Sequence, residues 1–205
     1  MSGIVDKRGR LATLSSGGPI VLELGCGERK RRAEAIGIDA IDYDSVDVVG
    51  DIFDVLAAIP DEAVDEIYSS HFVEHLPDLE RLVRELRRVL KVGGRVLTIA
   101  PHFSNPYFYS DYTHRAMFGL YTFSYLATDR IYTRRVPHYV KDSGFELLGA
   151  RLVFKAPRPF YLRHAWRKLV QIVVNSSVVM QECYEGGWCF LLPCYEVEYL
   201  VVKRH

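Results

Sequence analysis

The chain has 205 residues, of which 49% are hydrophobic and 25% are charged, an ordinary globular composition. Acidic and basic residues balance at 26 each, so no net field favours nucleic acid, and we expect no nucleic-acid partner. The first residues lack the apolar core of a secretory signal, and no apolar run is long enough for a transmembrane segment. The four cysteines lack Cys-x-x-Cys spacing, which argues against a zinc site and favours free thiols in the cytoplasm.

Short apolar runs alternate with helical patterns, which predicts an α/β fold with a mostly parallel sheet. Strands are expected at 19–24, 35–39, 46–51 and 64–71. A helix follows from Asp78 as N-cap to the glycines at 93 and 94, and a fifth strand spans 95–101. After a long aromatic loop we expect a short helix at 136–143, a strand at 144–156, a helix at 161–182 and a last strand at 194–203.

The first strand ends on the turn Gly25-Cys26-Gly27. Glycines at a strand end let a ligand approach the backbone, and in an open α/β sheet ligands bind beyond the carboxyl ends of the strands. A dinucleotide fingerprint needs a third glycine, but Lys30 stands there. The segment before the second strand also gives barely two helical turns, which weakens an NAD or FAD interpretation.

Acidic residues accompany the ends of three consecutive strands: Glu23, Asp39 and Asp51. The first can face a cation, the second can bind both ribose hydroxyls, and the third can accept from an adenine amino group. A ligand with an ammonium group, a ribose, an adenine and no phosphate is S-adenosylmethionine. The alternative is that these acids are solvated loop residues.

These motifs occur in order in "VLELGCGERKRR…IGIDAIDYDSVDVVGDIFD…DEIYSSHFVEHLPDLERLVRELRRVLKVGGRVLTIAP", which resembles the class I S-adenosylmethionine-dependent methyltransferases. The closest type is the small one (type-11-like) of bacteria and archaea with a shortened first helix, and the resemblance covers about 19–154. It implies a single Rossmann-like doubly wound domain, whose seven-stranded sheet is mostly parallel with an antiparallel last strand.

The resemblance also implies which residues bind S-adenosylmethionine. The methionine end would be lined by Glu23, Gly25, Cys26 and Gly27, the ribose held by Asp39 and Ala40, the adenine by Asp51 and Ile52, and the inner wall formed by Ser70 and His71. The domain would span 1–205, with a helical insertion at about 157–193 between strands six and seven. The 161–182 helix of this insertion is expected to pack on the sheet, and a homodimer face or a membrane-surface contact is the alternative.

In this fold the loop after strand five faces the methyl group of the cofactor, and here it contains His102, Asp111 and His114. We expect His102 or His114 to be the base for a hydroxyl acceptor, oriented by Asp111. Either histidine could instead be a hydrogen-bonding part of the scaffold. No metal is part of this prediction, although the same three residues could hold a divalent ion that binds a diol.

The stretch "HFVEH" (71–75) matches H-x-x-E-H, a zinc-protease motif. That interpretation needs one regular helix, whereas here the stretch leaves a strand and meets Leu76-Pro77, so we discount it. The sequence therefore predicts a methyltransferase that acts on a small-molecule acceptor, at oxygen. The alternatives are an NAD(P)-dependent oxidoreductase and a non-catalytic protein that binds S-adenosylmethionine as a partner of another protein.

Overall fold

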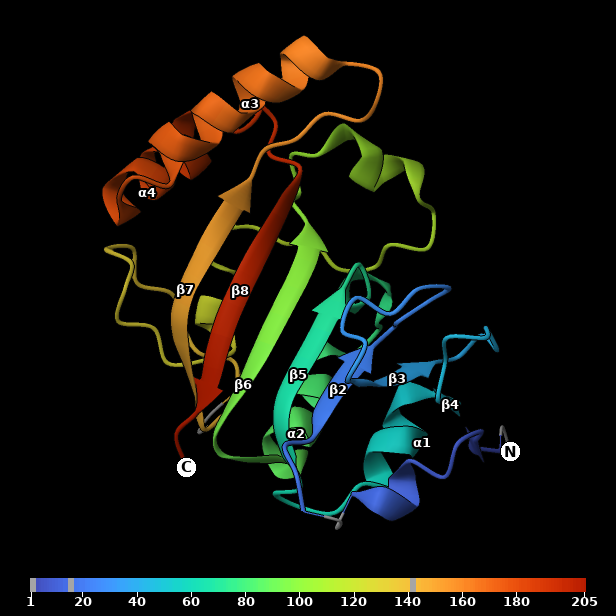
Figure 1. The fold of residues 1–205 in the computed structure, drawn as a ribbon. Helices are drawn as coiled ribbons and strands as arrows, with labels where there is room; N and C mark the ends of the chain where they lie inside the picture. Colours follow the sequence, from blue (N-terminus) through green and yellow to red (C-terminus); the bar gives the residue numbers. More distant parts are fainter. Residues whose placement is uncertain (1–2, 15–16, 141–142) are drawn as a thin grey trace.

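The computed structural model describes residues 3–14, 17–140 and 143–205. Its strands form one eight-stranded sheet in the order β1-β4-β3-β2-β5-β6-β8-β7 (Figure 1). The strands are β1 (Val5–Asp6), β2 (Val21–Leu24), β3 (Ile36–Asp39), β4 (Val48–Val49), β5 (Val64–Ser70), β6 (Leu90–Pro101), β7 (Phe145–Val153) and β8 (Glu196–Lys203).

The strands β4, β3, β2, β5 and β6 pair in parallel, and β8 lies antiparallel between β6 and β7. This confirms the predicted Rossmann-like α/β sheet with an antiparallel last strand. The structure adds one strand to the seven expected, because β1 pairs antiparallel with β4 at the edge of the sheet. Two residues are too few for an alternating pattern, so the sequence carries no signal for β1.

The α-helices are α1 (Ile52–Ala57), α2 (Leu79–Val89), α3 (Tyr161–Val174) and α4 (Val178–Gly187). Short 3₁₀ turns occur at η1 (Leu11–Thr13), η2 (Val73–His75), η3 (Pro106–Ser110) and η4 (Thr122–Tyr125). The predicted N-cap of α2 is confirmed, since the carboxylate of Asp78 accepts from the Arg81 amide. In Figure 1, α2 lies behind β5 and β6, while α3 and α4 lie beyond the carboxyl ends of β5, β6 and β7.

Two helix predictions were wrong. The helix expected at 161–182 is divided into α3 and α4, because the Asn175 side chain bonds both the amide and the carbonyl of Leu152 in β7, and Ser177 caps a new helix. The helix expected at 136–143 does not form in its described residues, 136–140 and 143, while 141–142 lie outside the described residues. His138 and Tyr139 there are exposed, so no buried face supports a helix.

The core lies between the sheet and the elements packed on it, with Leu22, Leu24, Ile38 and Ile67 almost fully buried in the central strands. Each such side chain contributes about 1.5–3 kcal/mol on burial. This rigid centre fixes the carboxyl ends of β2, β3 and β5 side by side, which is the edge where the candidate site residues lie.

Candidate functional site

The glycine turn between β2 and β3 has two positions with left-handed backbone, Gly25 at φ +65° and Gly27 at φ +57°. A Cβ on Gly25 would lie 2.5 Å from the Phe72 ring, so Gly25 is required by packing. A Cβ on Gly27 would meet nothing within 4 Å, so the backbone there faces open space. The turn therefore combines a packed residue with one that a ligand can approach.

The acids at the ends of β3 and β4 are tied to nearby backbone. Asp39 Oδ2 accepts from the Gly27 amide at 2.8 Å, and its Oδ1 accepts from the Ile41 amide at 2.9 Å. Asp51 caps α1 by accepting from the Phe53 amide at 2.9 Å. Each carboxylate oxygen has a further lone pair for a ligand hydroxyl or amino group. Beside them, Ala40 is exposed and Ile52 is buried.

Glu23, at the end of β2, is tied to the segment that follows the glycine turn. Its carboxylate is buried and accepts from the amides of Arg31 and Arg32, at 2.8 and 2.9 Å. The segment between β2 and β3 contains no helix among its residues 25–35, all of which are described, so its amides need other acceptors. Glu23 fills that need and holds the segment against β2 through its contacts with these backbone amides.

Lys30, the residue in place of the third glycine, turns into the protein. Its ammonium lies 2.7 Å from Asp47 Oδ2 and also donates to the Ala35 carbonyl at 3.0 Å. Asp47 is fully buried and accepts from the Gly37 amide at 2.8 Å, and Arg8 lies 2.7 Å from its other oxygen. No motif singles out Asp47, because it lies inside an apolar stretch.

Cys26, expected at the methionine end, is buried beneath the turn. Burial, together with the charges of Asp39 and Glu23, raises the pKa of the Cys26 thiol to about 12. The thiol is therefore neutral at physiological pH, which suits a packing role and not a nucleophile.

Ser70 and His71 end β5 and begin the next segment. His71 has a left-handed backbone, φ +53°, and its ring lies between two carboxylates, 3.1 Å from Glu196 and 3.5 Å from Glu74. The hydrogen bond with Glu196, and then the contact with Glu74, raise the pKa of His71 to about 9. The imidazole is therefore cationic at neutral pH.

The structure brings the predicted pair Asp111 and His114 together, with His114 Nε2 3.6 Å from Asp111 Oδ2. They lie against two residues that the prediction discounted, Glu74 and His75 of η2. The amides of Arg115 and Ala116 donate to the Glu74 carbonyl and join the two segments. The H-x-x-E-H spacing was the available signal, but it was interpreted only as a motif on a regular helix, whereas η2 is a 3₁₀ turn.

His102 belongs to a separate cluster. It is fully buried, its Nε2 lies 2.9 Å from Glu185 of α4, and its Nδ1 lies 2.8 Å from the Ser104 hydroxyl. Both ring nitrogens thus have protein partners, and neither partner is Asp111 or His114. This environment favours the scaffold alternative for His102 over the role of base.

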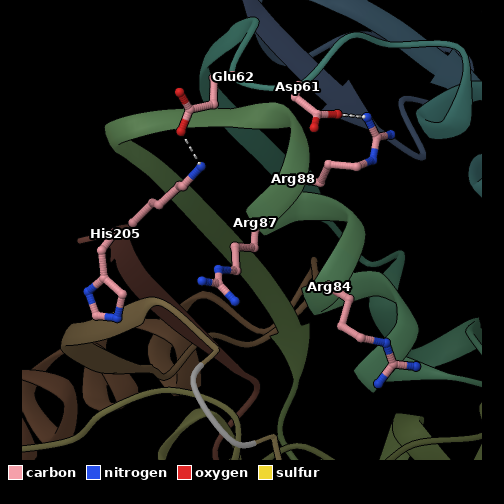
Figure 2. Close-up of a pocket in the computed structure, with 7 residues that line it drawn as sticks. Asp61, Glu62, Arg84, Arg87, Arg88 and His205 are labelled. Carbon is pink, nitrogen blue, oxygen red and sulfur yellow. Dashed lines mark hydrogen bonds and ion pairs between the residues drawn. The ribbon is translucent and has the colours of Figure 1, made fainter.

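A cavity of about 580 Å³ lies at the opposite edge of the sheet (Figure 2). Its charged residues pair with one another, with Asp61 2.7 Å from Arg88 and Glu62 3.0 Å from Lys203. The remaining lining residues are Arg84, Arg87 and His205. The cavity is far along the strands from the glycine turn, since Lys203 ends β8 and β8 runs antiparallel to β6, so it is not a candidate for the site.

Residues 22–98 match the profile of a family described as "Methyltransferase domain". No curated protein sequence matches the chain. The fold is similar to that of an S-adenosylmethionine-dependent methyltransferase of Archaeoglobus fulgidus, with a TM-score of 0.57 and 20% sequence identity, covering 95% of this chain and 90% of that chain. It is also similar to that of the methyltransferase in a complex with the Trm112 activator of Haloferax volcanii, with a TM-score of 0.53 and 16% identity, covering 98% of this chain and 89% of that chain. A third similar structure is phosphoethanolamine N-methyltransferase 2 of Haemonchus contortus, with a TM-score of 0.52 and 15% identity, covering 96% of this chain and 52% of that chain.

The family match and the shared fold confirm the resemblance, the fold class and the enzyme class predicted from the sequence, and with them the cofactor class.

Proposed function

We propose that this class I S-adenosylmethionine-dependent methyltransferase methylates an oxygen atom of a small molecule. The observation that carries this proposal is the open backbone at Gly27, whose amide donates to Asp39 at the carboxyl end of β3, together with the acid and base pair of Asp111 and His114 after β6. Phe72 links the two regions, because its ring packs on Gly25 and it precedes η2 by one residue.

For the cofactor, we propose the residues implied by the family resemblance. The turn of Gly25, Cys26 and Gly27 receives the methionine end, and Ser70 and His71 form the inner wall. Glu23 supports this end through the Arg31 and Arg32 amides. Asp39 with Ala40 receives the ribose, and Asp51 with Ile52 receives the adenine.

The chemistry is an in-line displacement. A lone pair of the acceptor oxygen attacks the methyl carbon, the bond from that carbon to sulfur breaks, and its electron pair stays on sulfur to give neutral S-adenosylhomocysteine. The acceptor also loses its hydroxyl proton, and Asp111 and His114 are the groups we propose to receive it. Much of the rate comes from positioning the two reactants.

The test is calorimetric titration with S-adenosylhomocysteine, with NAD as the comparison ligand. We expect micromolar affinity for the first and none for the second. Asp39→Ala should weaken binding roughly 10- to 100-fold, as expected for loss of hydrogen bonds to a charged group. The matched control is Asp44→Ala, since Asp44 is exposed on the adjoining loop and should leave the affinity unchanged.

Binding of NAD without S-adenosylhomocysteine would replace this proposal with the oxidoreductase alternative. Binding of S-adenosylhomocysteine with no methyl transfer to any hydroxyl, amine or thiol acceptor screened would favour the non-catalytic alternative. Circular dichroism of Asp39→Ala, and of Asp39→Asn as a second variant, separates loss of binding from loss of fold.

We further propose that the chain forms a homodimer through α3, whose outward side chains Leu162, Trp166 and Ile172 are 90%, 57% and 69% exposed. Apolar exposure of this extent on one helix favours a partner surface. No helix among the described residues could cross a membrane. Our proposal of a cytoplasmic location rests on the four cysteines, all of which are free.

A further inference from the structure

We propose that Glu74, His75 and His114 bind a divalent first-row transition-metal ion such as Zn²⁺, with one coordination position open to the methyl acceptor. The role of the ion rests on the proposed function, but its binding does not. The site differs from the diol-binding alternative considered from the sequence, because His102 lies in another cluster and Glu74 and His75 take part instead.

The three ligand atoms already converge. They lie within 4.8 Å of one another, and the Nε2 atoms of His75 and His114 are each 4.0 Å from Glu74 Oε1. A tetrahedral ion with bonds of 2.0–2.2 Å places its ligand atoms roughly 3.4 Å apart. Side-chain rotations that shorten the two 4.0 Å separations from Glu74 by about 0.6 Å, and bring the two histidine nitrogens closer together, would therefore complete the coordination sphere.

The Glu74 carboxylate lacks the partners that its burial demands. The residue is fully buried, and neither Oε1 nor Oε2 has a hydrogen-bond partner among the described residues. His71 lies 3.5 Å from Oε1 and offers opposite charge, but it does not satisfy either oxygen. A buried carboxylate without donors is strongly unfavourable, whereas a bound cation would satisfy it directly.

His75 and His114 each contact the protein through Nδ1, which leaves Nε2 of each ring available to bind a metal ion. The Thr113 hydroxyl donates to Asp111 Oδ1 at 2.6 Å, so it accepts from His75 Nδ1–H at 2.8 Å. His114 Nδ1–H donates to the Phe108 carbonyl at 2.8 Å. In both rings the Nε2 lone pair therefore faces Glu74, and a histidine whose other nitrogen donates to the protein is the arrangement typical of metal ligands.

The backbone holds the ligands in place from both sides. Glu74 and His75 belong to η2, and the Arg115 and Ala116 amides bind the Glu74 carbonyl at 2.7 and 3.2 Å. This contact fixes the turn that carries two ligands to the segment that carries the third. The side chain of His75 is 36% exposed while that of Glu74 is fully buried, so the open coordination position faces the solvent side, where an acceptor can enter.

Two imidazoles and one carboxylate suit Zn²⁺ and its neighbours, whereas Mg²⁺ and Ca²⁺ prefer all-oxygen sites. A hydroxyl bound to such an ion loses its proton at a much lower pH than in water. With the His114 lone pair on the ion, the proton passes to Asp111, whose Oδ2 lies 3.6 Å from that nitrogen. The oxygen then attacks the methyl carbon, and the electron pair of the broken carbon–sulfur bond stays on sulfur.

The experiment uses the full chain after chelator treatment and dialysis, titrated with Zn²⁺ by calorimetry. We expect one ion per chain with submicromolar affinity, and no saturable binding of Mg²⁺ or Ca²⁺. His75→Ala and His114→Ala should each weaken Zn²⁺ binding at least tenfold. His138→Ala is the matched control, because His138 is exposed and lies outside the cluster. Glu74→Gln, which keeps the shape of the side chain, tests the carboxylate without opening a cavity.

Titration of every variant with S-adenosylhomocysteine separates the two proposals. A chain that binds S-adenosylhomocysteine but no Zn²⁺ overturns the metal site and leaves the methyltransferase proposal intact. A chain that binds Zn²⁺ but no S-adenosylhomocysteine overturns the methyltransferase proposal and leaves the metal site intact. Equal Zn²⁺ affinity in the parent chain, His75→Ala and His114→Ala also overturns the site, since the ion would then be bound elsewhere.

Discussion

At the scale of single residues, Asp47 shows how this chain replaces a glycine-rich turn with a buried ion pair. Burial by itself would raise the pKa of Asp47, but hydrogen bonds from Lys30 and Gly37 and the charges of Lys30 and Arg8 lower it below the ordinary value. Because the folded pKa is depressed, the stability from ionised Asp47 is present above the unfolded pKa, about 3.9, and is lost as pH falls through the folded value.

We therefore predict that Asp47→Asn lowers the free energy of unfolding by about 3 kcal/mol at pH 7, because it leaves Lys30, whose side chain is only 12% exposed, without its charged partner. The difference from the parent chain should shrink as the pH falls below about 4. Urea denaturation between pH 7 and pH 3 measures this, with Asp44→Asn as the exposed control. A difference that stays constant over this range would show that the ion pair is not its source.

Single residues also differ in how well the sequence predicts their place in the candidate site. Asp39 and Asp51 could be found because strand ends share one edge of the sheet, and Asp111 and His114 because they follow the fifth strand. The H-x-x-E-H spacing includes Glu74, but its burial without donors depends on the tertiary fold, which no local pattern encodes. In the sequence His102 and His114 are equivalent candidates. Only the contact of Glu185, 83 residues away in the chain, with the His102 ring distinguishes them.

At the scale of elements, α2 could be predicted because its apolar period and its cap at Asp78 agree. The break between α3 and α4 could not, because the apolar period continues across it and a contact from Asn175 to β7 decides the boundary. In α3 the inward residues Val170 and Val174 are buried, while the outward apolar side chains remain exposed. Intrinsic helix pattern alone would not distinguish these two faces.

This division predicts different outcomes for the two faces of α3. The double variant L162E/I172E should convert a dimer to a monomer and change the free energy of unfolding by less than about 0.5 kcal/mol, since both side chains are exposed. Val170→Ala should leave the oligomeric state unchanged and lower the free energy of unfolding by about 2 kcal/mol. Light scattering and urea denaturation give both quantities, and a monomeric parent chain would contradict the proposed dimer.

At the scale of the whole molecule, the helices inserted between β7 and β8 organise a loop that is distant in sequence. Glu185 of α4 lies 2.9 Å from His102 Nε2 and accepts from the Leu120 amide at 2.7 Å. Glu182, one turn earlier, accepts from the Thr133 hydroxyl at 2.6 Å. The segment between His102 and Thr133 carries Asp111 and His114, whereas the residues proposed to bind the cofactor lie at the carboxyl ends of β2, β3 and β5 and at the start of α1. Cofactor binding and acceptor positioning should therefore depend on different parts of the chain.

We predict that Glu185→Ala separates these two properties. The loss of its carboxylate leaves His102 and the Leu120 amide without their partners, which should lower the free energy of unfolding by about 2–3 kcal/mol. Amide hydrogen exchange between residues 102 and 120 should become faster, because local opening there costs less, while exchange in β2 and β3 should follow only the global change. The affinity for S-adenosylhomocysteine should stay within about twofold of the parent value at temperatures where both are folded. Glu34→Ala, whose side chain is 62% exposed, is the control and should change none of these quantities. Faster exchange spread evenly over the sheet would mean that α4 stabilises the molecule as a whole, and that the acceptor loop is not a separately anchored unit.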